Sequence, residues 1–211
     1  MATAAPSPTP GWRSRGYLPH RDKYRLLQAV TFRLADSLPQ EKLQALRHSL
    51  STLPQTTQDL ERRKQVEAWL DAGIGCCALR HPALAAAVET ALLHHDAQHY
   101  HLLAWCIMPN HVHVLLQPLT PLAGILQSWK SHTGRWALER NAELELGVPG
   151  KSLWMREYWD RYIRDETHLK NVIAYIHTNP VKAGLAPAAT LWPWSSARHL
   201  GTPSSSSAPP T

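Results

Sequence analysis

The chain has 211 residues, with 22 Lys and Arg against 16 Asp and Glu, a formal net charge of +6 and an isoelectric point near 9.4. This length suits a single domain with short extensions, and the basic balance favours a polyanionic partner, nucleic acid first of all. The three cysteines lack the spacing of a disulfide framework, and no apolar run is long enough to cross a bilayer, which argues against secreted and membrane proteins. We expect a cytoplasmic protein with no membrane partner.

The two ends of the chain are dominated by Pro, Ala, Ser and Thr, and such segments bury too little apolar surface to offset the entropy lost on ordering. The sequence therefore predicts disordered tails over residues 1–12 and 201–211 around one domain over residues 13–200. Five basic residues and one acidic residue lie between positions 13 and 25. This basic arm is either a DNA contact, through Arg13 and Arg15, or a solvated lead into the fold.

The first elements of the domain are predicted from hydrophobic spacing. A strand rich in Val, Thr and Phe is expected over residues 26–34. Apolar residues three to four positions apart then predict helices over residues 39–50, over residues 60–72, and from Pro82 to about residue 94.

The second half of the domain is predicted to contain a β-hairpin and two helices. Residues 100–108 and 111–117 have the composition of strands and are separated only by a Pro-Asn pair, which predicts an antiparallel hairpin. Helical spacing continues over residues 122–145, and a last long helix is expected over residues 166–178. Helices mixed with few strands favour an α+β domain built on an antiparallel sheet.

Two histidines, His111 and His113, lie one residue apart in the second strand of this hairpin. Side chains at alternate positions of a strand face the same side, so both rings should lie together. Two imidazoles that close repel each other when protonated, and a shared cation suits them when they are neutral. The alternative is an ordinary pair of hydrogen-bonded surface histidines.

The last long helix carries Tyr175 and Asn179, which are four residues apart and therefore one turn apart on the same face. A phenol oxygen can act as a nucleophile, and an amide oxygen is a ligand for hard divalent cations. If this face meets the histidines, the site would have two nitrogens, one oxygen and open positions, which suits Mg²⁺ or Mn²⁺ carrying a phosphate oxygen. The alternative is that Tyr175 is a core aromatic and Asn179 a helix stop.

Four stretches occur in a consistent order over about residues 24–198: AWCIMPNHVHVLLQP, ILQSWKSHTG, LWMREYWDRYIRDETHLKNVIAYIHTNPVKAGL and WPWSSA. Together they resemble the REP-associated tyrosine transposases, a branch of the single-tyrosine transposases among the HUH (His-hydrophobe-His) endonucleases. The resemblance implies a ferredoxin-like or RRM-like antiparallel sheet with packed helices, and it places the histidine pair on a central strand.

The same resemblance implies roles for the residues of the site. His111 and His113 match the metal-binding pair, Tyr175 matches the nucleophile, and Asn179 matches the polar residue that completes the metal site. Enzymes of this family cut single-stranded DNA near a hairpin, form a 5′-phosphotyrosine and release a 3′-hydroxyl. We therefore expect a divalent metal, Mg²⁺ or Mn²⁺, and no nucleotide cofactor.

Two other functions and the assembly stay open. The first alternative is a non-catalytic regulator that binds hairpin DNA on the same fold, and the second is a metal hydrolase that uses water, with Tyr175 structural. The active site is completed either within one chain or by a second chain in a homodimer. Basic and aromatic side chains are expected to contact single-stranded or hairpin DNA, although each basic one could equally be a solvated charge and Trp129 a core residue. The candidates are Arg13, Arg15, Trp129, Lys130, Arg135, Arg161, Arg164 and Lys182.

Overall fold

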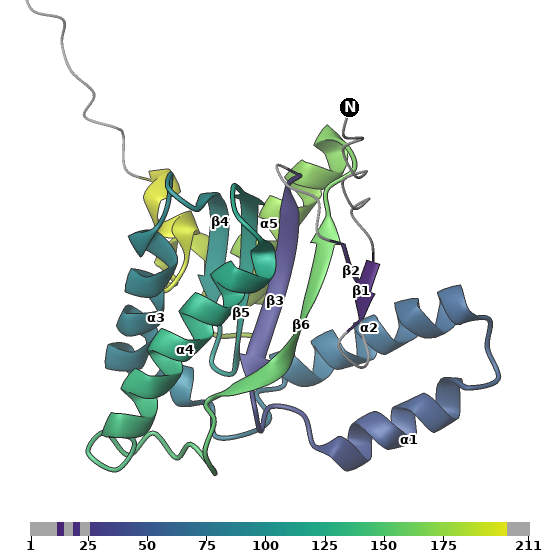
Figure 1. Cartoon of the computed structure of the whole chain (residues 1–211), viewed down its shortest axis with the longest axis horizontal. Helices are drawn as coiled ribbons and strands as arrows, with labels where there is room; N and C mark the ends of the chain where they lie inside the picture. The colour runs from purple at the N-terminus through teal and green to yellow at the C-terminus, as the bar shows by residue number, and fades with distance from the viewer. Residues whose placement is uncertain (1–11, 15–18, 22–25, 202–211) are drawn as a thin grey trace, which may run out of the picture.

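The computed structural model describes residues 12–14, 19–21 and 26–201 (Figure 1). At its centre is a four-stranded antiparallel sheet in the order β4-β5-β3-β6. The strands are β3 (Gln28–Leu34), β4 (Tyr100–Ile107), β5 (His111–Pro118) and β6 (Trp154–Tyr162). β1 (Trp12–Ser14) and β2 (Pro19–Arg21) pair with each other in a separate small sheet. The predicted α+β class with an antiparallel sheet is thus confirmed.

The chain runs through the sheet in a β-α-β-β-α-β order, which is the ferredoxin-like arrangement. α3 (Pro82–His94) connects β3 to β4, and α4 (Leu122–Arg140) connects β5 to β6. Both helices pack on one face of the sheet, and α5 (Glu166–Lys182) lies on the other face (Figure 1). β5 and β3 are therefore the two central strands, each covered on both faces.

Alternation along β5 decides which side chains meet which helices. Val112 and Val114 belong to the core beneath α3 and α4, whereas Leu115 belongs to the smaller apolar cluster beneath α5. Because the side-chain period of a strand is two residues, His111 and His113 face the α5 side together with Leu115. The hydrophobic pattern of this strand thus fixes the face on which both imidazoles lie.

Trp129 lies in the core between α4 and the sheet, with 3% of its surface exposed. Its indole Nε1 donates to the Tyr100 hydroxyl over 3.1 Å, and its ring stacks on Phe32 with centroids 6.1 Å apart. The predicted DNA contact through Trp129 is therefore wrong, because the side chain is used by the core.

Trp129→Ala is expected to lower the free energy of unfolding by about 3–5 kcal/mol, the usual range for emptying a buried aromatic position. The indole also binds the buried Tyr100 hydroxyl, which would lose this partner. Equilibrium unfolding in urea measures the change, with a shift of the midpoint at constant slope as the expected result. A change below about 1 kcal/mol would contradict the core assignment.

A helical hairpin is inserted between β3 and α3. It consists of α1 (Gln40–Leu50) and α2 (Gln55–Asp71) and projects from the sheet at the right of Figure 1. A small apolar cluster built on Leu38, Val66 and Leu70 anchors it, with Trp159 of β6 packed against this cluster. α2 therefore reaches back from the projecting hairpin to the α5 side of the sheet.

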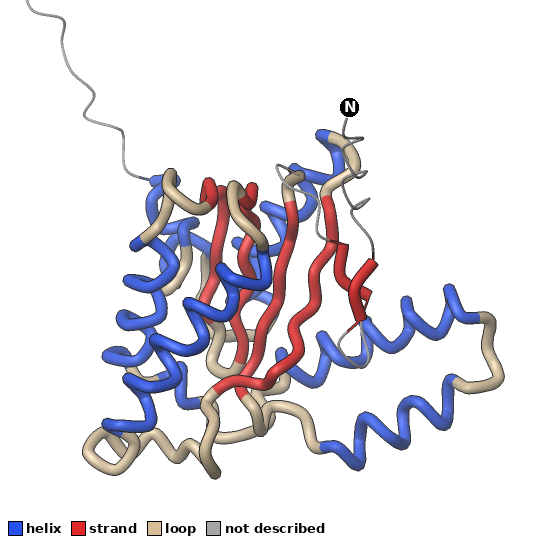
Figure 2. The backbone as a smooth tube through the Cα atoms, viewed as in Figure 1, coloured by secondary structure: helices blue, strands red, loops and turns tan. Residues whose placement is uncertain are grey.

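The strand β6 is missing from the sequence-based prediction. Only its residues Trp154 and Tyr158 are buried, because β6 is an edge strand, and charged residues interrupt its apolar pattern. A long loop precedes it at the lower edge of Figure 2, since α4 ends at Arg140 rather than near residue 145. Sequence alternation is weak in such a strand, so local pattern does not reveal it.

The remaining elements are short turns of 3₁₀ helix: η1 (Ala78–Arg80), η2 (Ala189–Leu191) and η3 (Ser196–Gly201). The predicted tails over residues 1–12 and 201–211 lie outside the described residues, apart from Trp12 in β1 and Gly201 in η3. Among the helices that the structure describes, none is both long and apolar enough to span a membrane.

Candidate active site

His111 and His113 form a buried pair on the central strand β5, with 1% and 4% of their surfaces exposed. Their rings meet edge to face, with centroids 4.6 Å apart. The two Nε2 atoms face each other over 2.9 Å. The pair is therefore preformed, and its Nε2 atoms converge.

The Nδ1 atom of each ring has its own partner. His111 Nδ1 lies 2.7 Å from the side-chain oxygen of Asn110, whose amide nitrogen donates to the carbonyl of Ile74. His113 Nδ1 lies 2.8 Å from the hydroxyl of Thr31 on the neighbouring strand β3. With this amide orientation, His111 Nδ1 carries the proton and Nε2 presents a lone pair. Histidines that bind metals are usually oriented by such partners.

Both imidazoles are neutral at physiological pH. Burial lowers the pKa of His113 to about 3. Burial lowers the pKa of His111 well below its ordinary value, and the neighbouring His113 lowers it further. Neutral rings are the ligand form of histidine. At 2.9 Å the two Nε2 atoms are at hydrogen-bond distance, so in the neutral pair His113 Nε2 can carry a proton and donate it to the lone pair of His111 Nε2. A cation bound by both nitrogens would take the place of that proton.

Tyr175 of α5 joins the pair from the facing layer. Its ring meets that of His113 edge to face, with centroids 5.4 Å apart and an angle of 77° between the planes. The ammonium of Lys182 lies 4.8 Å from the centre of the phenol ring. Burial raises the pKa of Tyr175 above its ordinary value, and the negative charges of Glu67 and Asp71 raise it further. The phenol is therefore protonated at neutral pH unless additional positive charge arrives.

Asn179 lies one turn beyond Tyr175 and is fully buried. Neither its amide oxygen nor its amide nitrogen has a hydrogen-bond partner of ordinary geometry within the described part of the chain. The amide still lies close enough to the phenol to oppose the rise of the Tyr175 pKa. An unpaired buried amide costs about 1–3 kcal/mol, so a ligand that used this oxygen would recover part of that cost.

α2 contributes acidic groups to the same site. A carboxylate oxygen of Asp71 lies 4.0 Å from His111 Nε2. Burial raises the pKa of Asp71, against the effect of the Lys182 charge. A pocket of about 380 Å³ opens beside the site and is lined by α2, α5 and the sheet, including Glu67, Thr31, Trp159, His113 and Tyr175.

Asn110, Thr31 and Asp71 were missed by the sequence analysis. Asn110 directly precedes His111, but the Pro-Asn pair is typical of a turn. The sequence analysis therefore assigned Asn110 to the turn and did not predict its contact with His111 Nδ1. Thr31 reaches His113 only through the pairing of β3 with β5, and Asp71 only through the packing of an inserted hairpin. No local sequence pattern indicates either contact.

The structure brings together the predicted His111, His113 and Tyr175, with Asn179 on the Tyr175 face. Arg161 lines the adjoining pocket, and Arg164 and Lys182 are exposed near the two ends of α5. Lys130 and Arg135 lie on α4, on the opposite side of the sheet. The side chain of Arg13 and the whole of Arg15 fall outside the described residues.

The donor set can be tested against a divalent metal. Bonds of about 2.1 Å at a right angle put neighbouring ligand atoms about 3.0 Å apart, close to the 2.9 Å between the two Nε2 atoms. In the described residues, no three His, Cys, Asp or Glu side chains form a metal site by themselves. The residues fit an octahedral ion if the unpaired Asn179 oxygen and water complete the shell.

Thr31→Val is expected to weaken Mn²⁺ binding by about tenfold or more, because it removes the hydroxyl that orients His113. Isothermal titration calorimetry measures this affinity. Thr133→Val is the matched control: it deletes a buried hydroxyl on α4, which accepts from the Trp154 indole, and should lower stability alone. Equal metal affinities for wild type and Thr31→Val would contradict the orienting role.

Comparisons of the sequence with known proteins all point to transposases. Residues 80–179 match the family model described as transposase IS200 like. A Haemophilus influenzae protein provisionally named a REP-associated tyrosine transposase is 29% identical over 100 residues, covering 44% of this chain and 56% of that protein. The REP-associated tyrosine transposase of Escherichia coli K12 is 25% identical over 92 residues, covering 44% and 51%. The resemblance drawn from the sequence motifs is thereby confirmed.

The chain spans about half the length of the curated relatives it matches. Among solved structures, a REP-associated tyrosine transposase bound to a REP hairpin is similar, with a TM-score of 0.48 and 17% sequence identity. That match covers 85% of this chain and 82% of the other.

Proposed function

Because residues 80–179 belong to the IS200-like transposase family, we propose that this chain is a metal-dependent single-strand DNA endonuclease and strand transferase with Tyr175 as its nucleophile. The observation that carries the proposal is the contact between the Tyr175 ring and the ring of His113, whose Nε2 faces that of His111. A nucleophile and a cation site are thus adjacent, as phosphoryl transfer requires.

His111, His113 and Asn179 would hold Mg²⁺ or Mn²⁺, and the ion would offset negative charge on the phosphate being cut. The Tyr175 oxygen attacks the phosphorus in line with the 3′ oxygen. A bond from phosphorus to the phenol oxygen forms, the bond to the 3′ oxygen breaks, and the DNA leaves with a 3′-hydroxyl. The phenol loses its proton and the 3′ oxygen gains one.

The 5′-phosphotyrosine keeps the energy of the broken phosphodiester bond. A 3′-hydroxyl can therefore attack it later and rejoin a strand without a nucleotide cofactor. Lys182 supports the attack, because its ammonium beside the phenol ring favours the charge that develops on the oxygen. We propose that Arg161, which lines the pocket, and Arg164, which is exposed before α5, bind phosphates flanking the cut.

The experiment is incubation with Mn²⁺ and an internally labelled DNA oligonucleotide that carries a hairpin and a single-stranded flank. A labelled band that migrates with the protein on a denaturing gel is the expected result. Cut DNA with two free ends would instead support a hydrolase that uses water. Intact DNA, retarded only on a native gel, would support a non-catalytic binding protein.

A further inference from the structure

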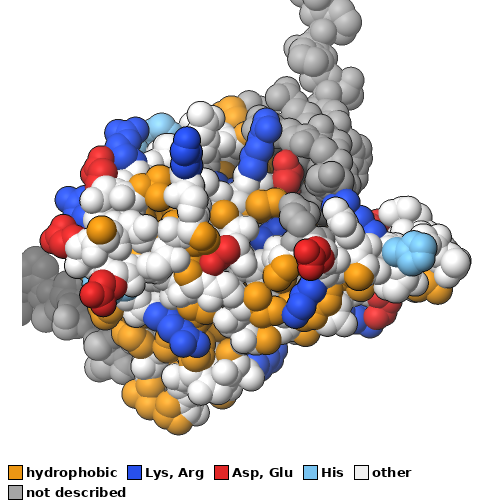
Figure 3. Space-filling model, turned by 90° about the horizontal axis from the view of Figure 1, so that it is seen from below, with side chains coloured by type: hydrophobic (Ala, Val, Ile, Leu, Met, Phe, Trp, Pro, Cys, Tyr) orange, Lys and Arg blue, Asp and Glu red, His pale blue; other side chains and the backbone are white. Residues whose placement is uncertain are grey.

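Acidic and basic side chains are interspersed over the lower end of the molecule (Figure 3), so surface charge alone does not indicate where a cation binds. One carboxylate differs from the rest, that of Asp71 at the end of α2. Its oxygen lies 4.0 Å from His111 Nε2, and 30% of its side chain is exposed. Burial keeps the pKa of His111 low and its ring neutral, so this contact is not a salt bridge. Within the described part of the chain, the Asp71 carboxylate has no other ion pair and no hydrogen bond.

The position of Asp71 on α2 disfavours a negative charge. The C-terminal end of a helix carries a partial negative charge, and the last turn of α2 contains no basic residue. Glu67 lies four residues earlier on the same face of the helix, and two like charges at this spacing repel. Burial raises the pKa of Asp71 as well, and the charge of Lys182 only opposes this rise. Departures of this kind from ordinary helix preferences are expected at functional sites.

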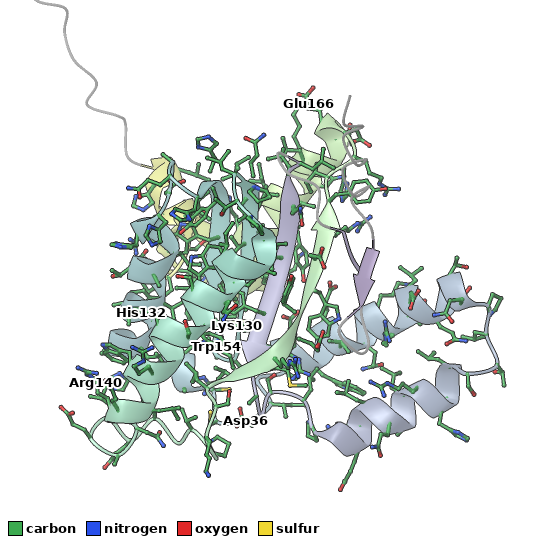
Figure 4. The ribbon with its side chains drawn as sticks, viewed as in Figure 1. Asp36, Lys130, His132, Arg140, Trp154 and Glu166 are labelled. Carbon is green, nitrogen blue, oxygen red and sulfur yellow. The ribbon has the colours of Figure 1, made fainter. Side chains whose placement is uncertain are left out.

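The turn that follows α2 fixes Asp71 at the edge of the candidate site. The carbonyl of Ile74 accepts from the side chain of Asn110, which also binds Nδ1 of the first imidazole. A Cβ on Gly75 would lie 2.9 Å from the carbonyl oxygen of Asp36, which Figure 4 labels below the lower end of β3. The backbone after Asp71 is therefore attached to the residue that orients one of the two histidines.

The distance from Asp71 to the histidine pair suits an octahedral ion. With bonds of about 2.1 Å, two ligand atoms lie about 3.0 Å apart at neighbouring positions and about 4.2 Å apart at opposite positions. The 4.0 Å between the Asp71 oxygen and His111 Nε2 falls inside this range. Among the described residues, these side chains do not enclose an ion by themselves, so a rotation of the Asp71 side chain would complete the set.

We propose that Asp71 is a further ligand of the divalent ion, so that the inserted helical hairpin adds a carboxylate to a site otherwise built from β5 and α5. The inference rests on the proposed function in taking His111 and His113 as a metal site. Carboxylate oxygens are ligands that Mg²⁺ and Mn²⁺ prefer, and the negative charge would offset one of the two charges of the ion. Together with Asn179, four protein atoms would hold the ion, which leaves two octahedral positions for water and a phosphate oxygen.

The test is calorimetric titration of Mn²⁺ into the full chain without DNA, for wild type, Asp71→Asn and Asp71→Ala. Asn keeps a side-chain oxygen without the charge, whereas Ala removes both. We expect the affinity to fall about tenfold in Asp71→Asn and about a hundredfold in Asp71→Ala, since ligand charge and ligand number both set the affinity of such sites. Glu67→Gln removes the same charge one turn away on α2 and should lower the affinity less than about threefold.

Melting temperatures separate a metal ligand from a structural residue. Neither Asp71 variant should melt below wild type in the absence of metal, because the end of α2 disfavours the charge that is removed. The rise in melting temperature that Mn²⁺ produces should be smaller in both variants. A lower melting temperature without metal together with an undiminished rise would overturn the proposal. Equal losses of affinity in Asp71→Ala and Glu67→Gln would also overturn it, since charge alone would then explain the effect.

The proposed function is judged separately, by whether wild type forms the covalent adduct with DNA. Weaker Mn²⁺ binding by Asp71→Ala without any wild-type adduct would support the ligand and refute the nuclease. A wild-type adduct together with unchanged Mn²⁺ affinity in Asp71→Ala would refute the ligand and leave the nuclease standing. Wild type that binds no Mn²⁺ at all would overturn the ligand as well.

Discussion

Tyr175→Phe is expected to abolish the covalent adduct with DNA, with a loss of at least about a thousandfold in the rate of cutting. The change removes one oxygen, the atom proposed to bond to phosphorus. It keeps the ring that packs against His113 and the cluster beneath α5, so the fold should be retained. Affinity for hairpin DNA should stay within about twofold, because cations supply most of it.

The measurement is the labelled band on a denaturing gel, together with anisotropy for binding. Tyr100→Phe is a matched control, because it also deletes a buried phenol oxygen, on the other face of the sheet. That oxygen donates to the carbonyl of Leu92 and accepts from Trp129, so its loss should cost about 1–2 kcal/mol of stability and leave the adduct intact. An adduct formed by Tyr175→Phe would show that another residue is the nucleophile.

The central part of the fold could be predicted because its signals are local. The strand pair around Pro109 has a plain apolar pattern, and Pro82 begins α3 as a first-turn proline does. β6 could not be predicted, because its position depends on pairing with β3, more than a hundred residues earlier in the chain. Trp129 was misassigned for a related reason: helical spacing does not say which face of α4 meets the sheet.

The candidate site, too, could be predicted only where its signals are local in the sequence. The two periodicities, two residues in a strand and about four in a helix, placed His111 beside His113 and Tyr175 beside Asn179. The two pairs meet because α5 packs on the face of β5 that carries the histidines and Leu115. Sequence spacing alone does not show that these two surfaces come together. The oriented Nδ1 atoms and the acidic helix α2 are tertiary features throughout.

Replacement of either histidine of the pair is expected to cause a large loss of both metal binding and DNA cutting. We expect His111→Ala and His113→Ala each to weaken Mn²⁺ binding at least about a hundredfold and to abolish cutting, because each deletes one of the two converging Nε2 atoms. Binding of hairpin DNA should be largely retained. Calorimetric titration of Mn²⁺ into the protein without DNA measures metal affinity independently of activity.

Thermal unfolding gives a second readout of the metal site. A ligand at a hundred times its dissociation constant stabilises the folded state by about 2.7 kcal/mol, which corresponds to a rise of about 5–10 °C in melting temperature for a domain of this size. Mn²⁺ should produce this rise in wild type and not in the two variants.

The control is His177→Ala, which removes a buried imidazole of α5. Within the described residues, the hydrogen-bond partner of this imidazole is the Ser196 hydroxyl. It should lower the starting melting temperature yet keep the full rise with Mn²⁺. This comparison separates the loss of a metal ligand from the loss of a packed ring, since both kinds of variant empty a buried histidine position. An undiminished rise in His111→Ala/His113→Ala would mean that the ion binds elsewhere and that the two Nε2 atoms of the wild type share only a proton.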